Sequence, residues 1–353
     1  MTIVELMDAH EGFSIITDRI KIKKKSHLLW ALTLVTFFLS ALLDNLTTAI
    51  VMAAVLRKMI KNRNDLLFFA STMIIAANAG EAWSPIGDVT TIMLWIGGQI
   101  TTTNIITQIF VPSLVAAIVP LIIFSLRAKG YVDLNDLKSN SVHAEMNPIS
   151  RFEKNLVFFT GISVLLFVPI FKTWTHLPPF MGVLFGLSII WILTEILHKK
   201  KNEEHRKSLS ITSIIQRIDT PSILFFLGIL ISVAALETTG HLTQLSNVLD
   251  ANFKSIYMVN TLIGLLSSVI DNVPMVAAAM GMYSMETYPV DHSFWELLAY
   301  CAGTGGSILI IGSAAGVAIM GIFKIDFVWY LKNISFVAFL GYLLGIITFI
   351  VLN

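Results

Sequence analysis

Two apolar stretches of the sequence are each too long for one membrane helix, and each contains an Asp-Asn pair near its middle. The first is divided at Asp44-Asn45 and the second at Asp271-Asn272. One membrane span needs roughly 20 apolar residues. Each stretch therefore predicts two shorter helices that meet at the Asp-Asn pair.

The composition indicates a polytopic membrane protein. Of the 353 residues, 55% are hydrophobic and 13% are charged, and the mean hydropathy is +0.77, which is far from the mixture of a soluble domain. The net charge of +1 gives no broad basic surface for nucleic acid. We therefore expect the lipid bilayer, and no nucleic acid, as a partner.

Basic residues on both sides of the first stretch set its orientation. They are Lys21, Lys23, Lys24 and Lys25 before it, and Arg57, Lys58, Lys61 and Arg63 after it. Basic clusters stay on the cytoplasmic side, so the chain should enter and leave by one face as a re-entrant hairpin. Such a non-helical tip is tolerated in a membrane only where protein or a wet cavity surrounds it.

The same charge rule predicts the remaining topology. The basic loop 128–154 falls in the cytoplasm, and the second stretch, which has few basic flanking residues, enters as a hairpin from outside. The C-terminus is then outside. We expect this multi-pass arrangement in a bacterial inner membrane.

The two halves resemble each other, which predicts an inverted repeat. LLDNLTTAIVMAA (42–54) is similar to VIDNVPMVAAAMG (269–281), and inverted repeats with discontinuous helices are typical of secondary transporters. The expected parts are a first repeat over 1–127 (hairpin 28–60, broken helix 65–98, helix 104–127), the cytoplasmic loop 128–154, and a second repeat over 155–353 (hairpin 255–286, broken helix 294–322, last helix 327–352).

The repeats differ before their hairpins. The second repeat has apolar helices near 155–171, 178–197 and 221–236, whereas the first has only a short stub and an amphipathic stretch over 11–25. By symmetry, we expect an intact protein to have about two and a half further N-terminal helices.

Four acids lie where a charge is costly in a bilayer: Asp44, Glu81, Asp88 and Asp271. A charged side chain at the centre of a membrane helix costs roughly 2.5 to 3.5 kcal/mol or more, so each acid is a functional candidate. The alternative for the two hairpin tips is that Asp44 and Asp271 only cap the helices that follow.

The segment AANAGEAWSPIGDVTT (76–91) is a second dense group of polar residues. Its helix-breaking residues are Gly80, Pro85 and Gly87, and its candidate ligands are Asn78, Glu81, Ser84 and Asp88. A break frees backbone groups to bind a substrate or ion. The alternative is a Pro-kinked helix with packing glycines.

The matching segment of the second half, 302–316, keeps Gly305, Gly312 and Ser313 but has no acid. Pro274, just after the second tip, suits the first turn of a helix. The sequence thus predicts an acidic break beside the first tip and a neutral break beside the second tip.

Carboxylates, amides and hydroxyls together are ligands for a small hard cation. A carboxylate that is withdrawn from water near other acids holds a proton more readily. If Na⁺ and H⁺ compete for the same carboxylates, loading one requires release of the other. The pattern therefore predicts antiport without a cofactor.

At LLDNLTT, NAGEAWSPIGDVTT and VIDNVPM the chain resembles the NhaD-type sodium/proton antiporters of the ion transporter superfamily. The resemblance implies an all-α elevator-type transporter, usually a homodimer, that expels Na⁺ or Li⁺ in exchange for H⁺. By position it implies a first cation site at Asp44, Asn45, Thr48, Ser84 and Asp88 and a counterpart at Asp271, Asn272 and Ser313. We expect Na⁺ at Asp44, Asn45, Asp88 and Asp271.

Two alternatives remain at this stage. Relatives of this superfamily carry arsenite or di- and tricarboxylates, but the carboxylate carriers have a neutral Ser-Asn-Thr at their tips. The other alternative is an intramembrane aspartyl protease built on Asp44 and Asp271, for which only Ile86-Gly87-Asp88 approaches the expected motif. We expect a transporter and no enzyme.

Overall fold

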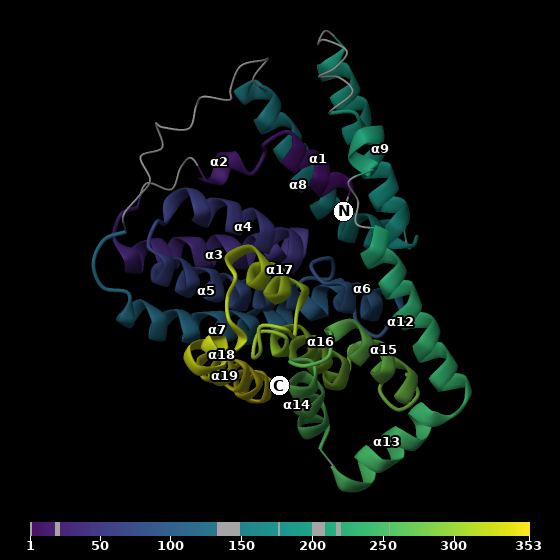
Figure 1. The fold of residues 1–353 in the computed structure, drawn as a ribbon. Coiled ribbons are helices and arrows are strands. Elements are labelled where there is room, and N and C mark those ends of the chain that lie inside the picture. The colour runs from purple at the N-terminus through teal and green to yellow at the C-terminus, as the bar shows by residue number, and fades with distance from the viewer. Residues whose placement is uncertain are drawn as a thin grey trace. The chain divides into compact units, whose positions relative to one another are not determined.

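The described part of the computed structural model is made of helices and one isolated bridge between Lys24 and Tyr131, with no strand in these residues. The described residues are 2–17, 22–132, 149–175, 177–199, 209–216, 220–253 and 255–353. Five of their helices are long and apolar enough to cross a membrane. The all-α membrane prediction is therefore confirmed (Figure 1).

The chain forms two compact units. The hairpin unit is Ile22–Asp133 with Ser222–Asn353, and the α8–α9 unit is Met1–Lys21 with Leu134–Pro221. The first contains both predicted hairpins, and the second contains α1 (Thr2–Ala9), α2 (Ser14–Thr17), α8 (Arg151–Thr175), α9 (Pro179–His198) and α11 (Ile211–Ile215). Helix α12 (Thr220–Thr238) begins at the boundary, and α13 (His241–Asn252) follows it.

The first apolar stretch forms a helical hairpin. Helix α3 (Lys25–Leu43) ends at Asp44, and α4 (Asn45–Met59) starts at the next residue. The start of α3 is tied to the start of the following helix, α5 (Arg63–Ala82), because Lys25 Nζ lies 2.7 Å from an Asp65 carboxylate oxygen. The chain therefore returns through α4 to the end from which it left.

The second apolar stretch makes a hairpin with a longer break. Helix α14 (Ile256–Leu266) and α15 (Asn272–Met282) are separated by residues 267–271, which are not helical. The Asn260 amide donates to the Phe294 carbonyl at 3.2 Å, which links the first turns of α14 to the start of α16 (Ser293–Gly305). This chain segment also returns to its starting end.

Two helices are broken, as the glycine positions predict. Helix α5 gives way to α6 (Val89–Ile96), and α16 gives way to α17 (Ala314–Phe323). A Cβ on Gly80 would overlap the carbonyl of Phe37, and a Cβ on Gly305 would overlap that of Gly264. Both carbonyls lie seven residues before the Asp of their own hairpin tip, so the two halves make the same close contact.

Helices α7 (Thr102–Arg127) and α19 (Phe336–Leu352) pack against each other and complete the hairpin unit. Gly341 and Gly345 of α19 leave room for the α7 backbone, because a Cβ at either would lie within 3 Å of an α7 carbonyl oxygen, Ala116 O or Pro112 O. A short helix, α18 (Phe327–Tyr330), and a π-helical turn (Leu331–Ser335) precede α19.

Helix α8 begins at Arg151, inside the region expected to be the loop 128–154. Ser150 and Glu153 form a reciprocal capping box: Glu153 N donates to Ser150 Oγ and Ser150 N donates to a Glu153 carboxylate oxygen, both at 3.1 Å. This arrangement stabilises a helix start and moves the end of the loop four residues earlier. Residues 133–148 of the predicted loop lie outside the described residues.

The predicted amphipathic stretch 11–25 is only partly described. The short helix α2 covers Ser14–Thr17, residues 18–21 lie outside the described residues, and α3 starts at Lys25. The corresponding stretch of the second half is the full helix α13.

Candidate functional site

Four helices of the hairpin unit begin at residues that the sequence analysis selected. The N-cap residues are Asp44 for α4, Asp88 for α6, Asp271 for α15 and Ser313 for α17. Helix α4 packs on α17 and α15 packs on α6, so each hairpin contacts the broken helix of the other half. The helix starts of both halves thereby contribute to one region.

The first tip consists of one residue, Asp44, between the end of α3 and the start of α4. Its φ of 87° is in the region that residues other than glycine rarely adopt, at a cost of about 1 to 3 kcal/mol. One carboxylate oxygen accepts from Thr47 N at 2.7 Å and the other accepts from the Thr47 hydroxyl at 3.0 Å. The predicted capping role is present, and the half-buried carboxylate is held in one orientation.

Asn45 links the first tip to the acidic break. Its backbone N–H donates to one Glu81 carboxylate oxygen at 2.9 Å, and its side-chain amide donates to the other at 2.6 Å. The same amide donates to Asn78 Oδ1 at 3.0 Å, and the Asn78 amide donates to Ser313 Oγ at 3.0 Å. Glu81 is only 1% exposed, so this network fixes a fully buried acid.

The second tip contacts the acidic break as well as the neutral break, which extends the sequence prediction. The Asn272 amide donates to an Asp88 carboxylate oxygen at 3.0 Å. The predicted neutral break also lies beside this tip, since a Cβ on Gly312 would lie 2.5 Å from the Ser268 carbonyl oxygen. The sequence prediction missed the bond to Asp88 because it paired the second tip only with the break of its own half, whereas α15 packs on α6 of the other half as well as on α16. Both tip amides thus bind acids of one segment.

Asp88 accepts hydrogen bonds both from its own segment and from the second hairpin tip. Its carboxylate accepts from Thr90 N at 3.2 Å, from the Thr90 hydroxyl and from Asn272, and it is 5% exposed. A Cβ on Gly303 would lie 3.7 Å from an Asp88 carboxylate oxygen. Helix α16 therefore comes close to this acid at Gly303.

The other selected residues surround these contacts. Thr48 is completely buried, and its hydroxyl has no partner in the described structure. Ser84 accepts from Ile86 N at 3.3 Å, and Asp271 accepts from Asn272 N at 2.9 Å and is half-buried. Pro85 and Gly87 lie between α5 and α6, Pro274 is in the first turn of α15, and Gly312 precedes the cap of α17.

Comparisons with known proteins show the family. The chain matches the citrate transporter family over residues 1–298. It is 48% identical over its whole length to sodium/proton antiporter 1 of Arabidopsis thaliana and 45% identical to sodium/proton antiporter 2 of the same plant. It is 33% identical over 92% of its length to the Na⁺/H⁺ antiporter NhaD of Vibrio cholerae.

The chain is a member of the citrate transporter family, of the NhaD type. It spans 60% of the length of the first plant relative, 83% of the second and 70% of the Vibrio cholerae protein.

The acids of this NhaD-type site are close but do not form one cage. Asp88 is near enough to interact electrostatically with Asp44, Glu81 and Asp271. In the described part of the chain, however, no three His, Cys, Asp or Glu side chains converge as ligands of one metal ion. A cation here needs amide, hydroxyl or backbone oxygens in addition to the carboxylates.

One buried acid escaped the sequence analysis. Glu296, in the first turn of α16, is 3% exposed, and its carboxylate accepts a hydrogen bond from the Asn104 amide of α7. The signal was present, since Glu296 lies inside the apolar run 294–322. It was missed because it is near the end of that run and not at a break.

Proposed function

We propose that this chain carries the ion-exchange core of a secondary antiporter, which moves Na⁺ or Li⁺ out of the cytoplasm in exchange for external H⁺. The observation that carries the proposal is the pair of amide-acid bonds, Asn45 to Glu81 and Asn272 to Asp88. They join both hairpin tips to two buried acids in one segment. The named antiporters among the relatives support the same exchange.

The proposed chemistry is competition between a cation and a proton. Na⁺ would bind at Asp44, Asn45, Asp88 and Asp271, with Thr48, Ser84 and Asn272 supplying further oxygens. The unpartnered Thr48 hydroxyl is the clearest spare ligand. Protonation of the carboxylates removes the charge that holds the cation, so one ion leaves as the other enters.

The carboxylates that cap the helix starts argue against an anionic substrate such as citrate. The N-terminus of a helix attracts anions, and four such ends contribute to the site. Three of them are already capped by the carboxylates of Asp44, Asp88 and Asp271. Among the described residues, no Lys or Arg forms an ion pair with these acids. A substrate carboxylate would meet negative charge here.

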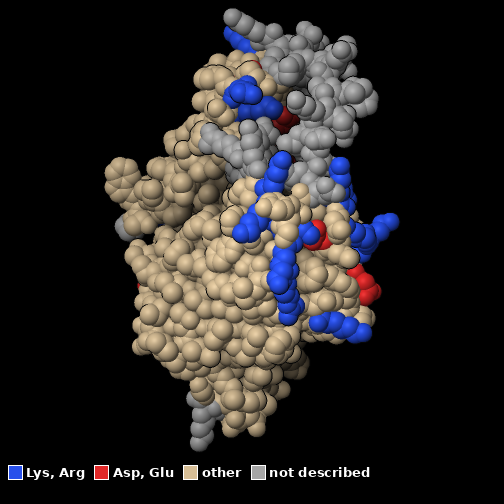
Figure 2. Space-filling model, turned by 90° about the vertical axis from the view of Figure 1, so that its left-hand side faces the viewer, with Lys and Arg blue, Asp and Glu red and all other residues tan. Residues whose placement is uncertain are grey.

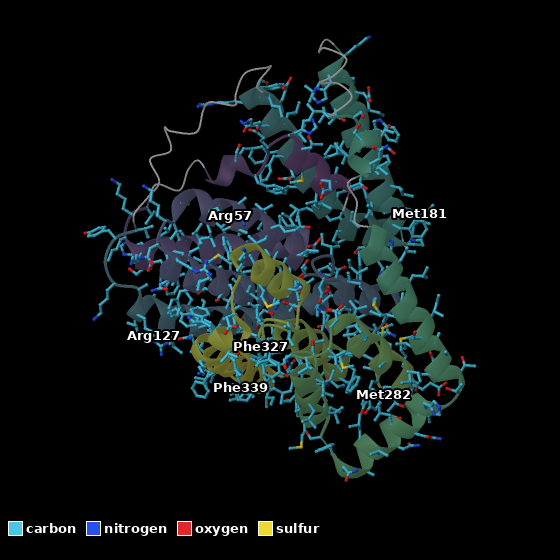
Figure 3. All side chains as sticks on the ribbon, viewed as in Figure 1. Arg57, Arg127, Met181, Met282, Phe327 and Phe339 are labelled. Atoms are coloured by element: carbon cyan, nitrogen blue, oxygen red, sulfur yellow. The ribbon has the colours of Figure 1, made fainter. Side chains whose placement is uncertain are left out.

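The contacts at the two ends of the hairpin unit support the proposed orientation. Arg57 donates to the Ile322 carbonyl and Arg63 to the Lys324 carbonyl, which joins segments assigned to the cytoplasmic side. Thr101 N donates to the Asp291 carboxylate at 2.6 Å, which joins two turns assigned to the outside. Figure 3 shows Arg57 and Met282, near the ends of the two hairpins, on opposite sides of this unit.

Basic side chains mark the proposed cytoplasmic face. Figure 2 views the side at which α3 begins and α7 ends, and Lys and Arg form a band there on a largely uncharged surface. Such clustering is typical of a cytoplasmic face. Because the relatives come from a plant as well as from bacteria, the bacterial inner membrane stays a proposal.

The division into two units supports an elevator mechanism. In this proposal the hairpin unit moves with its ions, and α7 and α19 move with it because they pack inside the same unit. The matched glycine contacts of the two halves support the inverted repeat. A homodimer is also part of the proposal.

An ion panel in vesicles tests the proposed exchange. The purified protein is reconstituted, a pH gradient is imposed, and its collapse is followed after addition of Na⁺, Li⁺, K⁺, citrate or arsenite. We expect Na⁺ or Li⁺ to collapse the gradient and citrate and arsenite to leave it intact. Collapse with citrate or arsenite and none with Na⁺ or Li⁺ would overturn the proposal.

The same assay tests competition between the ions. Protons and Na⁺ bind the same carboxylates, so the Na⁺ concentration for half-maximal exchange should rise as the pH falls, by up to about tenfold per pH unit for one shared proton. A half-maximal concentration that does not change with pH would show that the two ions bind at separate groups.

A further inference from the structure

A second group of polar residues lies at the end of the hairpin unit where α7 and α16 begin. Both carboxylate oxygens of Asp291 accept bonds from Thr101, from its backbone N–H at 2.6 Å and from its hydroxyl at 2.8 Å. The Asn104 amide donates to the Asp291 carbonyl at 3.4 Å and also to the Glu296 carboxylate. Asn104 therefore links the backbone of half-buried Asp291 to the buried carboxylate of Glu296.

A negative charge on the Glu296 carboxylate is energetically costly in this position. Glu296 is nearly inaccessible to water, and the Asn104 amide is its one hydrogen-bonding partner in the described residues. The nearby Asp291 repels a second negative charge on Glu296. Among the described residues, no Lys or Arg forms an ion pair with Glu296. A buried acid held by a neutral amide and facing another acid is suited to bind and release a proton.

The helix geometry places Glu296 on the face of α16 that approaches the ion site. Glu296 and Gly303 are seven residues apart, so they lie on one face of α16, separated by about 10 Å along the axis. Gly303 is the residue through which α16 approaches Asp88. Glu296 and Asp88 thus lie along the same face of the helix, two turns apart, with Glu296 nearer to the end that we assign to the outside.

We infer that Glu296 is a proton-loading residue of the exchange: it takes protons from the outer solution, beside Asp291, and supplies them to the ion site at Asp88. This inference rests on the proposed function. It adds a proton-binding group that is separate from the acids at which Na⁺ and H⁺ compete. Asn104 orients the carboxylate, and Asp291 draws protons to the entrance.

The test compares Glu296→Gln with wild type in vesicles at matched internal and external pH, from about pH 6 to about pH 9. Glutamine keeps an oxygen that can accept from Asn104, but it cannot carry a proton. We expect the exchange rate to fall at least about tenfold at the alkaline end, where protons are scarce, and less than about twofold at the acid end. Glu286→Gln, an exposed position in the preceding loop, is the matched control and should keep the wild-type pH profile.

A second variant separates proton loading from structural support. Glu296→Asp can carry a proton, so it should recover most of the exchange lost at alkaline pH. The inference is overturned if Glu296→Gln keeps the wild-type pH profile, if it lowers exchange by one factor at every pH, or if Glu296→Asp is as impaired as Glu296→Gln. If wild type shows no Na⁺ or Li⁺ exchange at all, the proposed function itself fails.

Discussion

At the scale of single residues, Asn45 links the first hairpin tip to the buried acid Glu81. It provides both hydrogen bonds that the Glu81 carboxylate receives in the described structure, one from its backbone and one from its side chain. Because Glu81 is buried, loss of a partner is not compensated by water. The Asn45 amide therefore contributes to stability, whereas the neighbouring Asp44 contributes charge.

Asn45→Ala should lower the free energy of unfolding by about 1 to 3 kcal/mol, because it leaves buried Glu81 and Asn78 without the amide. Denaturant unfolding in detergent micelles would measure the loss. Asn252→Ala, which removes an exposed amide that bonds one carbonyl of its own helix, should change stability by less than about 0.5 kcal/mol. Equal effects of the two changes would contradict the role of Asn45.

The sequence predicted the residues of the site better than their pairing. Asp44 and Asp271 were selected at hairpin tips and Asp88 and Ser313 at helix breaks, and all four do cap helices. The bond from Asn272 to Asp88 joins positions 184 residues apart. It depends on how α15 packs on α6, and no local pattern specifies that contact.

At the scale of helices, the two halves are matched by glycines. Gly80 and Gly305 each allow a broken helix to touch the backbone of the first helix of its own hairpin. Gly80→Ala and Gly305→Ala should each cost about 1 to 3 kcal/mol, because the added methyl group overlaps a carbonyl. Thermal unfolding in detergent is the measurement.

Gly321→Ala is the control for this pair, since nothing lies within 4 Å of a Cβ at this helical position of α17. It should be neutral or stabilise by up to about 1 kcal/mol. If Gly80→Ala and Gly305→Ala behaved like Gly321→Ala, the close approach of the helices would not be needed.

Apolar length and charge predicted most helices, but not all of their ends. The prediction of hairpin 28–60 corresponds to α3 and α4, and that of 294–322 to α16 and α17. The second tip is broken over 267–271 and not at one residue, and Asp271 has an ordinary φ whereas Asp44 has a positive one. Backbone conformations of this kind are not specified by hydropathy.

At the scale of the whole molecule, the proposed topology can be tested by labelling. Native Cys301 is completely buried, so an impermeant maleimide should not react with the unchanged protein. Lys61→Cys, after the first hairpin, should react only from the cytoplasmic side, and Glu286→Cys, after the second hairpin, only from the outside. Both original positions are exposed. Reaction of both from one side would contradict the inverted arrangement.

The central claim is that the acids at the helix starts bind the transported ions and do not merely cap helices. Asparagine caps a helix about as well as aspartate, so Asp→Asn changes remove the charge and keep the cap. The most direct measurement is Na⁺-dependent proton exchange in vesicles by Asp44→Asn, Asp88→Asn and Asp271→Asn, with Asp326→Asn as the control. Asp326 caps α18 at an exposed position outside the site.

We predict that Asp44→Asn and Asp271→Asn each fold with a stability within about 1 kcal/mol of wild type. Asp88→Asn should lose about 1 to 3 kcal/mol, because its amide NH₂ must face one of two buried donors, Thr90 N or the Asn272 amide. Each of the three variants should lose at least about a hundredfold in exchange rate. Asp326→Asn should exchange like wild type. If a site variant exchanged within about twofold of wild type, its acid would only cap its helix, and ion binding at that hairpin tip or break would be contradicted.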